Sequence, residues 1–138
     1  MRINVLTPGF TTSNGSAFLF PFAVHKRALR EAQIEIRFVN RSSPDITDCD
    51  VLGIDSKEFR SDWDVESKTA TLELISSYNS RENKLFWFDT TDSTGTLQAA
   101  VIPLVDKYLK SQLLADRSRF ASQIYGGRVV SEYYRETV

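Results

Sequence analysis

Short apolar segments alternate with segments of helical periodicity through residue 89 of this chain, and this alternation restricts the fold more than any other feature. Residues 3–6 (INVL) form an apolar run that stops at residues 7–9 (TPG), where proline and glycine end a strand and turn the chain. Residues 17–32 then place apolar side chains at spacings of three and four, which predicts an amphipathic helix. Residues 34–39 alternate apolar and charged side chains, which predicts a second strand close to a sheet edge.

The same alternation continues along the chain. Residues 50–55 and 84–89 read as two further buried strands, separated by a helix that begins at about residue 66. Pro103 breaks the next apolar run, and a short strand is expected at residues 104–109. These elements predict one three-layer αβα Rossmann-like domain over residues 1–138, with a mainly parallel sheet and right-handed crossovers.

The predicted helix of residues 17–32 contains a proline and the single histidine of the chain. Pro21 suits the first turn of a helix, so regular helix is expected only from about Leu19, with Ser13 or Ser16 as the cap. Its spacing from Phe18 puts His25 on the apolar face. A lone histidine there is more often a packing residue than a catalyst, but His25 stays a candidate ligand-binding residue.

Composition excludes several classes of protein. A chain of 138 residues with 41% hydrophobic and 25% charged residues is typical of one globular domain. The net charge of -1 argues against nucleic-acid binding. Cys49 is the single cysteine and has no second thiol or histidine nearby in sequence, so we expect neither a disulfide nor a zinc site, and a reducing cytoplasm fits best. Since no run approaches the roughly 20 apolar residues that span a bilayer, any membrane association is expected to be peripheral.

Ligands of open parallel sheets bind beyond the carboxyl ends of the strands, where the strand order switches. The loops of residues 7–16, 55–64 and 89–95 are predicted to lie there. Residues 7–16 (TPGFTTSNGS) run into a helix N-terminus, whose free N–H groups suit a phosphate or carboxylate, and Gly9 and Gly15 would let a ligand approach the backbone. The loop carries neither GxGxxG nor GxxxxGK[ST], so an ordinary strand-to-helix turn is the equally open alternative.

Two further segments are candidates for binding. Asp89 and Asp92 could hold an acceptor hydroxyl or act as a general base, or they could cap a turn. Residues 106–135 hold six basic and three acidic residues with interleaved tyrosines. This stretch is either a surface for an anionic partner such as a lipid headgroup, or a solvated face or domain interface.

The order of these parts resembles the start of GT-B glycosyltransferases. The opening INVLTPGFTTSNGSAFLFPFAVHKRALREAQIEIRFV carries the strand, the loop with proline and glycine, and the helix of that family, and DCDVLGID and KLFWFDTTDSTG resemble its next strands. VDKYLKSQLLADRSRF is similar to segments of bacterial surface-polysaccharide glycosyltransferases. The chain departs from the family where Asn14 and Gly15 replace paired glycines, and where Ala32 and Gln33 replace a helix-ending Gly-His.

The resemblance implies the N-terminal, acceptor-side half of an enzyme that moves a sugar from a nucleotide sugar to a glycan or lipid-linked acceptor, without a tightly bound metal or cofactor. The donor site would lie mainly in a C-terminal Rossmann domain, so the isolated chain is expected to be inactive. The resemblance then assigns donor or acceptor binding to residues of the 7–16 loop and the following helix, namely Gly9, Asn14, Gly15, Ser16 and His25. It assigns catalysis to Asp89 and Asp92.

A non-enzymatic module with a flavodoxin-like fold is the alternative, and its loops would hold a small anion or a protein partner. A second domain of similar size downstream would favour the transferase, and a natural stop near Val138 would favour the module. A small hydrolase is disfavoured because the chain has no nucleophile elbow, zinc motif or nucleophile–base pair.

Overall fold

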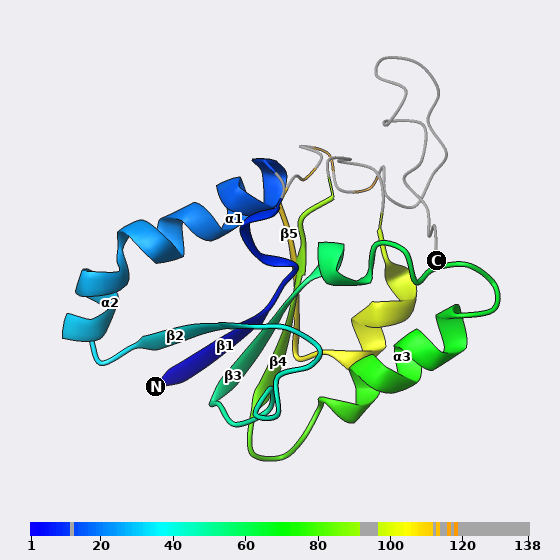
Figure 1. The fold of residues 1–138 in the computed structure, drawn as a ribbon. Coiled ribbons are helices and arrows are strands. Elements are labelled where there is room, and N and C mark those ends of the chain that lie inside the picture. Colours follow the sequence, from blue (N-terminus) through cyan, green and yellow to red (C-terminus); the bar gives the residue numbers. More distant parts are fainter. Residues whose placement is uncertain (12, 92–96, 112, 114–115, 117, 119–138) are drawn as a thin grey trace.

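A five-stranded, all-parallel sheet forms the centre of the molecule (Figure 1). The computed structural model describes residues 1–11, 13–91, 97–111, 113, 116 and 118, with the side chains of residues 13 and 14 left out. The strand order is β2-β1-β3-β4-β5. The strands are β1 (Arg2–Leu6), β2 (Glu35–Val39), β3 (Val51–Asp55), β4 (Lys84–Asp89) and β5 (Lys107–Lys110). The predicted α/β Rossmann-like fold is confirmed, and β2 lies at a sheet edge as expected.

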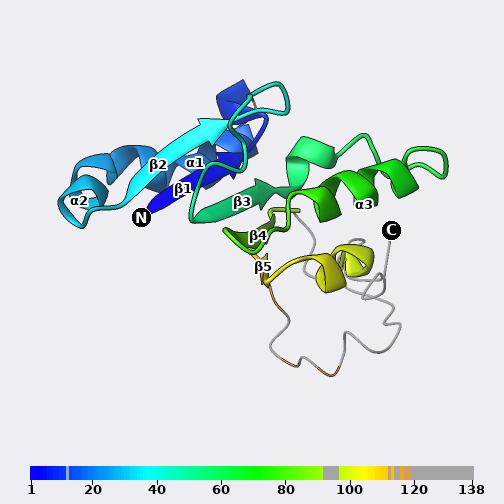
Figure 2. The same cartoon turned by 90° about the horizontal axis from the view of Figure 1, so that it is seen from below.

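Helices cover both faces of the sheet (Figures 1 and 2). One face carries α1 (Ser13–Val24) and α2 (Lys26–Glu31), which connect β1 to β2. The other carries α3 (Lys68–Ser77) and the 3-10 helix η3 (Ala99–Leu104), and two shorter 3-10 helices, η1 (Gly9–Thr11) and η2 (Ser56–Phe59), follow β1 and β3. In the described residues, no helix is long and apolar enough to cross a membrane.

The prediction of one continuous helix over residues 17–32 is wrong. Helix α1 starts at Ser13, carries Pro21 in its interior and ends at Val24, and α2 starts at Lys26. The helix breaks at His25, whose φ of -89° and ψ of 12° depart from α-helical values. The helix therefore begins earlier than expected, with the polar residues 13–16 (SNGS), and Pro21 does not lie in its first turn.

The main core lies between the sheet and the layer that contains α3 and η3. Register places Leu52 beside Leu85 and Ile54 beside Trp87, so these four buried side chains share one face. They pack in a cluster with η2, α3 and η3, whose buried members include Phe59, Ile75 and Val101. The β2–β3 connection closes this face at its edge without a helix. There, the buried Asn4 amide donates hydrogen bonds to the carbonyl oxygens of Asp45 at 3.1 Å and of Ile46 at 2.8 Å.

Candidate functional site

The strand order creates one switch point, between β1 and β3. From β1 the chain turns toward β2 on one side, while β3 lies on the other, so the loops that follow β1 and β3 diverge. Such a switch point is where open α/β sheets bind ligands. The loops predicted at residues 7–16 and 55–64 begin on either side of it, and residues 89–91 of the third loop follow the adjacent β4.

A buried carboxylate joins these three strand ends. Asp55 is fully buried, and its Oδ2 accepts a hydrogen bond from Thr7 Oγ1 at 3.1 Å. Its Oδ1 accepts from Thr90 Oγ1 at 2.6 Å and from the Lys57 backbone N–H at 3.1 Å. Ser56 Oγ accepts from the Thr90 backbone N–H at 3.1 Å. Four residues from the ends of β1, β3 and β4 therefore form one network, here named the Asp55 cluster (Thr7, Asp55, Ser56 and Thr90).

A second network lies beside it at the ends of β4 and β5. Asp89 and Lys110 form an ion pair with a distance of 2.9 Å, and their side chains are 0% and 2% exposed. Asp89 Oδ2 also accepts a hydrogen bond from Tyr108 Oη at 2.6 Å, and Oδ1 accepts from the backbone N–H and the hydroxyl of Thr91. We call this group the Asp89 cluster (Asp89, Thr91, Tyr108 and Lys110).

Tyr108 ties the Asp89 cluster to the core. Its hydroxyl accepts a hydrogen bond from the Gln98 backbone N–H at 3.0 Å, and the Gln98 side chain accepts from Trp87 Nε1 at 2.9 Å. Burial, and secondarily the hydrogen bond to Asp89, raise the pKa of Tyr108 far above its usual range. The hydroxyl thus stays protonated at all ordinary pH values and acts as a fixed donor to Asp89.

The predicted catalytic aspartates have different outcomes. Asp89 lies at the expected strand end, but both carboxylate oxygens are occupied by Lys110, Tyr108 and Thr91. A general base needs a free oxygen that faces the substrate, and Asp89 has none in this arrangement. Its carboxylate instead holds the ends of β4 and β5 together. Its catalytic role stays a prediction, as does that of Asp92, which lies outside the described residues.

The structure brings some of the predicted loop residues to the carboxyl edge. Gly9 has a φ of +78°, the left-handed conformation that favours glycine, and its N–H donates to Thr7 Oγ1 at 3.2 Å. Gly15 is buried in the first turn of α1, and Ser16 Oγ donates to the Phe10 carbonyl oxygen at 3.2 Å. The backbone of Asn14 belongs to the same turn, and its side chain is outside the description.

His25 does not join this group. It was expected on the apolar face of a continuous helix, but it lies exposed at the junction of α1 and α2. The prediction of its orientation is wrong because the helix breaks at this residue.

Sequence reasoning missed Lys110 as a buried residue and counted it among the basic residues of a surface stretch. The available signal was its spacing of two from Tyr108 in a short strand, which puts both side chains on one face. Asp55 and Thr90 were contained in the predicted loops, but nothing in the sequence indicated that they bond to each other.

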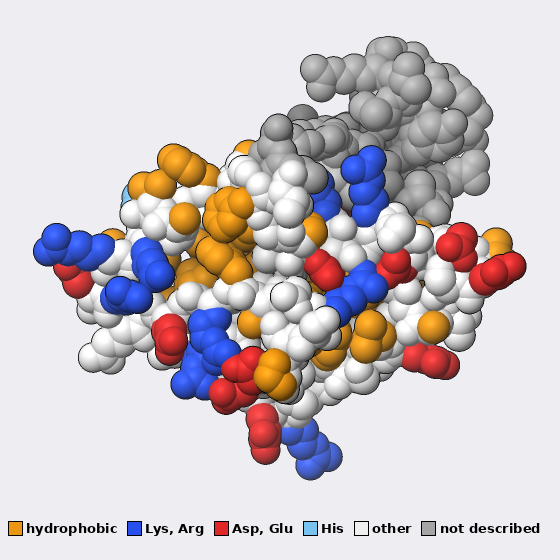
Figure 3. Space-filling model, in the orientation of Figure 1, with side chains coloured by type: hydrophobic (Ala, Val, Ile, Leu, Met, Phe, Trp, Pro, Cys, Tyr) orange, Lys and Arg blue, Asp and Glu red, His pale blue; other side chains and the backbone are white. Residues whose placement is uncertain are grey.

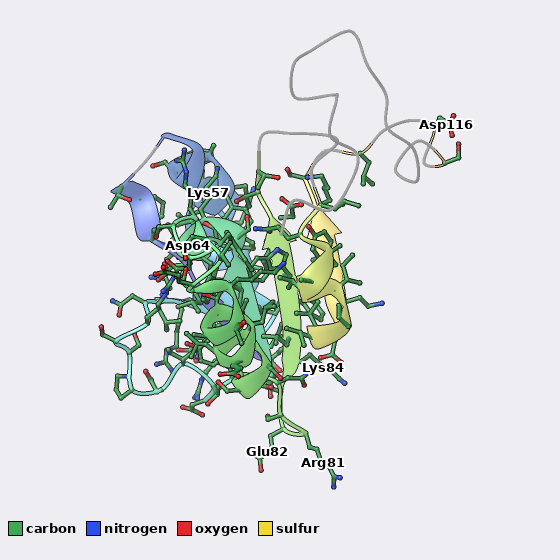
Figure 4. All side chains as sticks on the ribbon, turned by 90° about the vertical axis from the view of Figure 1, so that its right-hand side faces the viewer. Lys57, Asp64, Arg81, Glu82, Lys84 and Asp116 are labelled. Carbon is green, nitrogen blue, oxygen red and sulfur yellow. The ribbon has the colours of Figure 1, made fainter. Side chains whose placement is uncertain are left out.

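The chemistry of this edge is that of hydroxyl and carboxylate groups held in fixed positions. Thr90 and Thr91 are half-buried at the boundary of the two clusters, and Lys57 adds a cation at the same edge (Figure 4). Such groups suit a ligand rich in hydroxyls or a phosphate ester. In the part of the chain that the structure describes, no group of three or more His, Cys, Asp or Glu side chains is placed to hold a metal ion.

A surface hollow of about 770 Å³ lies at the opposite, amino edge of the sheet. Part of its polar wall is already paired: the Arg2 guanidinium contacts Asp48 at 2.7 Å, and the amino group of Met1 donates to the Gln33 carbonyl oxygen at 2.9 Å. Burial raises the pKa of the adjoining Cys49 thiol, which disfavours the reactive thiolate. The carboxyl edge is therefore the better candidate site.

Comparisons with known proteins add no assignment. No protein-family model, curated protein or solved structure matches this chain.

Proposed function

We propose that this chain is the acceptor-side half of a sugar transferase and that the carboxyl edge of its sheet forms one wall of the substrate cleft. The observation that carries the proposal is the linkage of the β1, β3 and β4 ends through the Asp55 carboxylate at the strand-order switch. This linkage holds Thr7 and Thr90 in fixed positions beside the site where such sheets bind ligands.

The arrangement supports acceptor binding better than donor phosphate binding. The residue 7–16 loop has no complete phosphate-binding fingerprint, and Ser16 uses its hydroxyl on the loop itself. Hydroxyl side chains at the edge can exchange hydrogen bonds with a glycan, and the Lys57 ammonium group can pair with the phosphate of a lipid-linked acceptor. The nucleotide sugar would bind mainly to a second, C-terminal Rossmann domain.

An NMR titration tests the proposal. The ¹⁵N-labelled chain is titrated with short glycans, with a prenyl-phosphate-linked sugar in micelles and with nucleotide sugars. We expect acceptor-type ligands to shift the amides of Thr7, Gly9 and Thr90, and to leave amides at the amino edge unchanged.

Two lysines provide matched variants at opposite edges of the sheet (Figure 4). Lys57→Ala is expected to weaken binding of the phosphate-linked acceptor several-fold, whereas Lys84→Ala leaves it unchanged. Shifts confined to the amino edge, or turnover of a nucleotide sugar by residues 1–138 alone, contradict the proposal.

The strand order favours a second candidate. β2-β1-β3-β4-β5 is the order of flavodoxin-like folds, which bind small anionic ligands at the β1–β3 switch. A binding module without transferase activity would respond to orthophosphate or a flavin mononucleotide through the residue 7–16 amides and would not respond to any glycan. That pattern in the same titration favours the module over the transferase.

A further inference from the structure

Helix α1 is apolar on both sides. Residues 17–24 (AFLFPFAV) contain no charged side chain. Its inner side is packed: Leu19 is fully buried, and the Phe18 ring contacts the Phe88 ring of β4 at 5.2 Å between centroids. Its outer side is exposed, with Phe20 62% and Val24 55% accessible. A helix that is apolar all round normally has apolar surroundings on every side, so the outer side requires a partner.

Helix α2 adds positive charge directly after this apolar surface. Lys26, Arg27 and Arg30 are all exposed, and residues 13–30 contain no acidic residue. The single acidic side chain of α2 is Glu31, which pairs with Arg27 at 2.9 Å. Figure 3 shows hydrophobic side chains gathered over α1 with Lys and Arg side chains beside them over α2, on one face of the molecule.

We propose that the outer surface of α1 and α2 (Phe20, Pro21, Val24, Lys26, Arg27 and Arg30) binds an anionic membrane surface. Exposed apolar side chains insert at the boundary of headgroups and acyl chains, and neighbouring lysine and arginine side chains pair with lipid phosphates. This inference goes beyond the proposed transferase function and does not depend on it.

Charge favours a membrane over a second copy of the chain. A twofold dimer through this surface would gather the basic residues of both copies in one interface, and their like charges would oppose association. An anionic bilayer instead complements the charge and takes up the apolar side chains at the same time. The short exposed stripe fits shallow insertion, which is the mode of interfacial helices.

Flotation with lipid vesicles tests this inference on the full chain. The vesicles are pure phosphatidylcholine or phosphatidylcholine with 30% phosphatidylglycerol, a composition chosen to set about one lipid in three as an anion. We expect binding to the anionic vesicles, weaker binding to the neutral ones, and a loss of binding at high salt.

Two variants separate the apolar and the charged contributions. Each basic residue near an anionic surface contributes roughly fivefold to partitioning, and Glu31 offsets part of this, so Lys26→Gln/Arg27→Gln/Arg30→Gln is expected to lower binding at least tenfold. Phe20→Ser/Val24→Ser removes the inserted side chains and is expected to lower it at least fivefold. All five side chains are exposed, so both variants are expected to keep the wild-type circular dichroism spectrum and unfolding midpoint.

Matched controls carry the same changes elsewhere on the surface. Arg60→Gln/Arg81→Gln/Lys84→Gln removes three exposed charges, and Val65→Ser/Ile102→Ser removes two exposed apolar side chains, of which Val65 is 94% and Ile102 45% accessible. Both controls are expected to bind vesicles like the wild type.

The proposal is overturned if the wild type does not float with anionic vesicles, or if the controls lose binding as strongly as the α1 and α2 variants. It is equally overturned if Phe20→Ser/Val24→Ser instead converts a dimer to a monomer in light scattering, with vesicle binding unchanged.

Discussion

Removal of Lys110 tests the Asp89 cluster most directly. Lys110→Met keeps an unbranched side chain that is one atom shorter than lysine and deletes the charge, which leaves the fully buried Asp89 carboxylate without a counter-charge. Removing one partner of a buried ion pair typically costs 3–5 kcal/mol. Asp89 would keep its hydrogen bonds from Tyr108 and Thr91, so we expect the lower end, about 3 kcal/mol.

Urea unfolding followed by circular dichroism measures this loss. With a slope of about 2 kcal/mol per molar urea for a chain of this size, the midpoint is expected to fall by about 1.5 M. Lys107→Met is the control, because Lys107 is on the same strand but exposed. In a double-mutant cycle, Lys110→Met/Asp89→Asn should cost less than the sum of the single changes by at least 1 kcal/mol, since the unpaired charge is removed as well. A loss below about 1 kcal/mol for Lys110→Met, or additive single and double changes, would refute the assignment of a tight buried pair.

Three further changes probe the edge and the sheet. Gly53→Ala would place a Cβ 2.5 Å from the Phe88 ring and is expected to cost roughly 1–3 kcal/mol in urea unfolding, less when combined with Phe88→Leu. Thr90→Val removes the donor to the buried Asp55 and is expected to cost about 1–3 kcal/mol, whereas Thr90→Ser keeps the hydroxyl and most of the stability; equal losses for the two changes would argue against this hydrogen bond. The backbone N–H of Leu85, and then Lys84, lower the pKa of Asp106, so its contribution is present above about pH 4 and is lost as pH falls through the folded pKa; Asp106→Asn should flatten acid unfolding in that range, and an unchanged pH profile would contradict this.

The sheet was predictable because its strands are short apolar runs bounded by turn residues. Register then follows from burial, since a slip by one residue would turn Leu52 and Trp87 away from the core cluster to the opposite face of the sheet. The break at His25 was not predictable from periodicity. Phe18, Phe22 and Leu29 keep the spacing of one helix face across the junction, as they would in a continuous helix. The fifth strand was expected at residues 104–109 and lies at Lys107–Lys110, since the Pro103 segment continues as η3 through Leu104.

The location of the candidate site was more predictable than its internal bonds. Loops at the carboxyl edge follow from the β-α-β order alone, and residues 7–16 and 55–64 were named on that basis. The pairing of Asp89 with Lys110 depends on two strand ends that are 21 residues apart in sequence. In the sequence, Lys110 lies in a segment of mixed charge, and such a lysine is normally predicted to be exposed. Only the strand order, which makes β4 and β5 neighbours, brings its ammonium group to a buried carboxylate.

The two proposed surfaces share one structural element, because the residue 7–16 loop at the switch point runs directly into α1. A protein that rests on a bilayer through the outer side of α1 would hold the start of that helix, and with it the Asp55 cluster, close to the headgroup layer. A lipid-linked acceptor could then reach the carboxyl edge without leaving the membrane. The two proposals are separable, because Phe20→Ser/Val24→Ser should reduce binding to vesicles and leave the response of Thr7 and Thr90 to a water-soluble glycan unchanged. If both responses fall together while the fold is intact, the outer side of α1 belongs to the acceptor site itself.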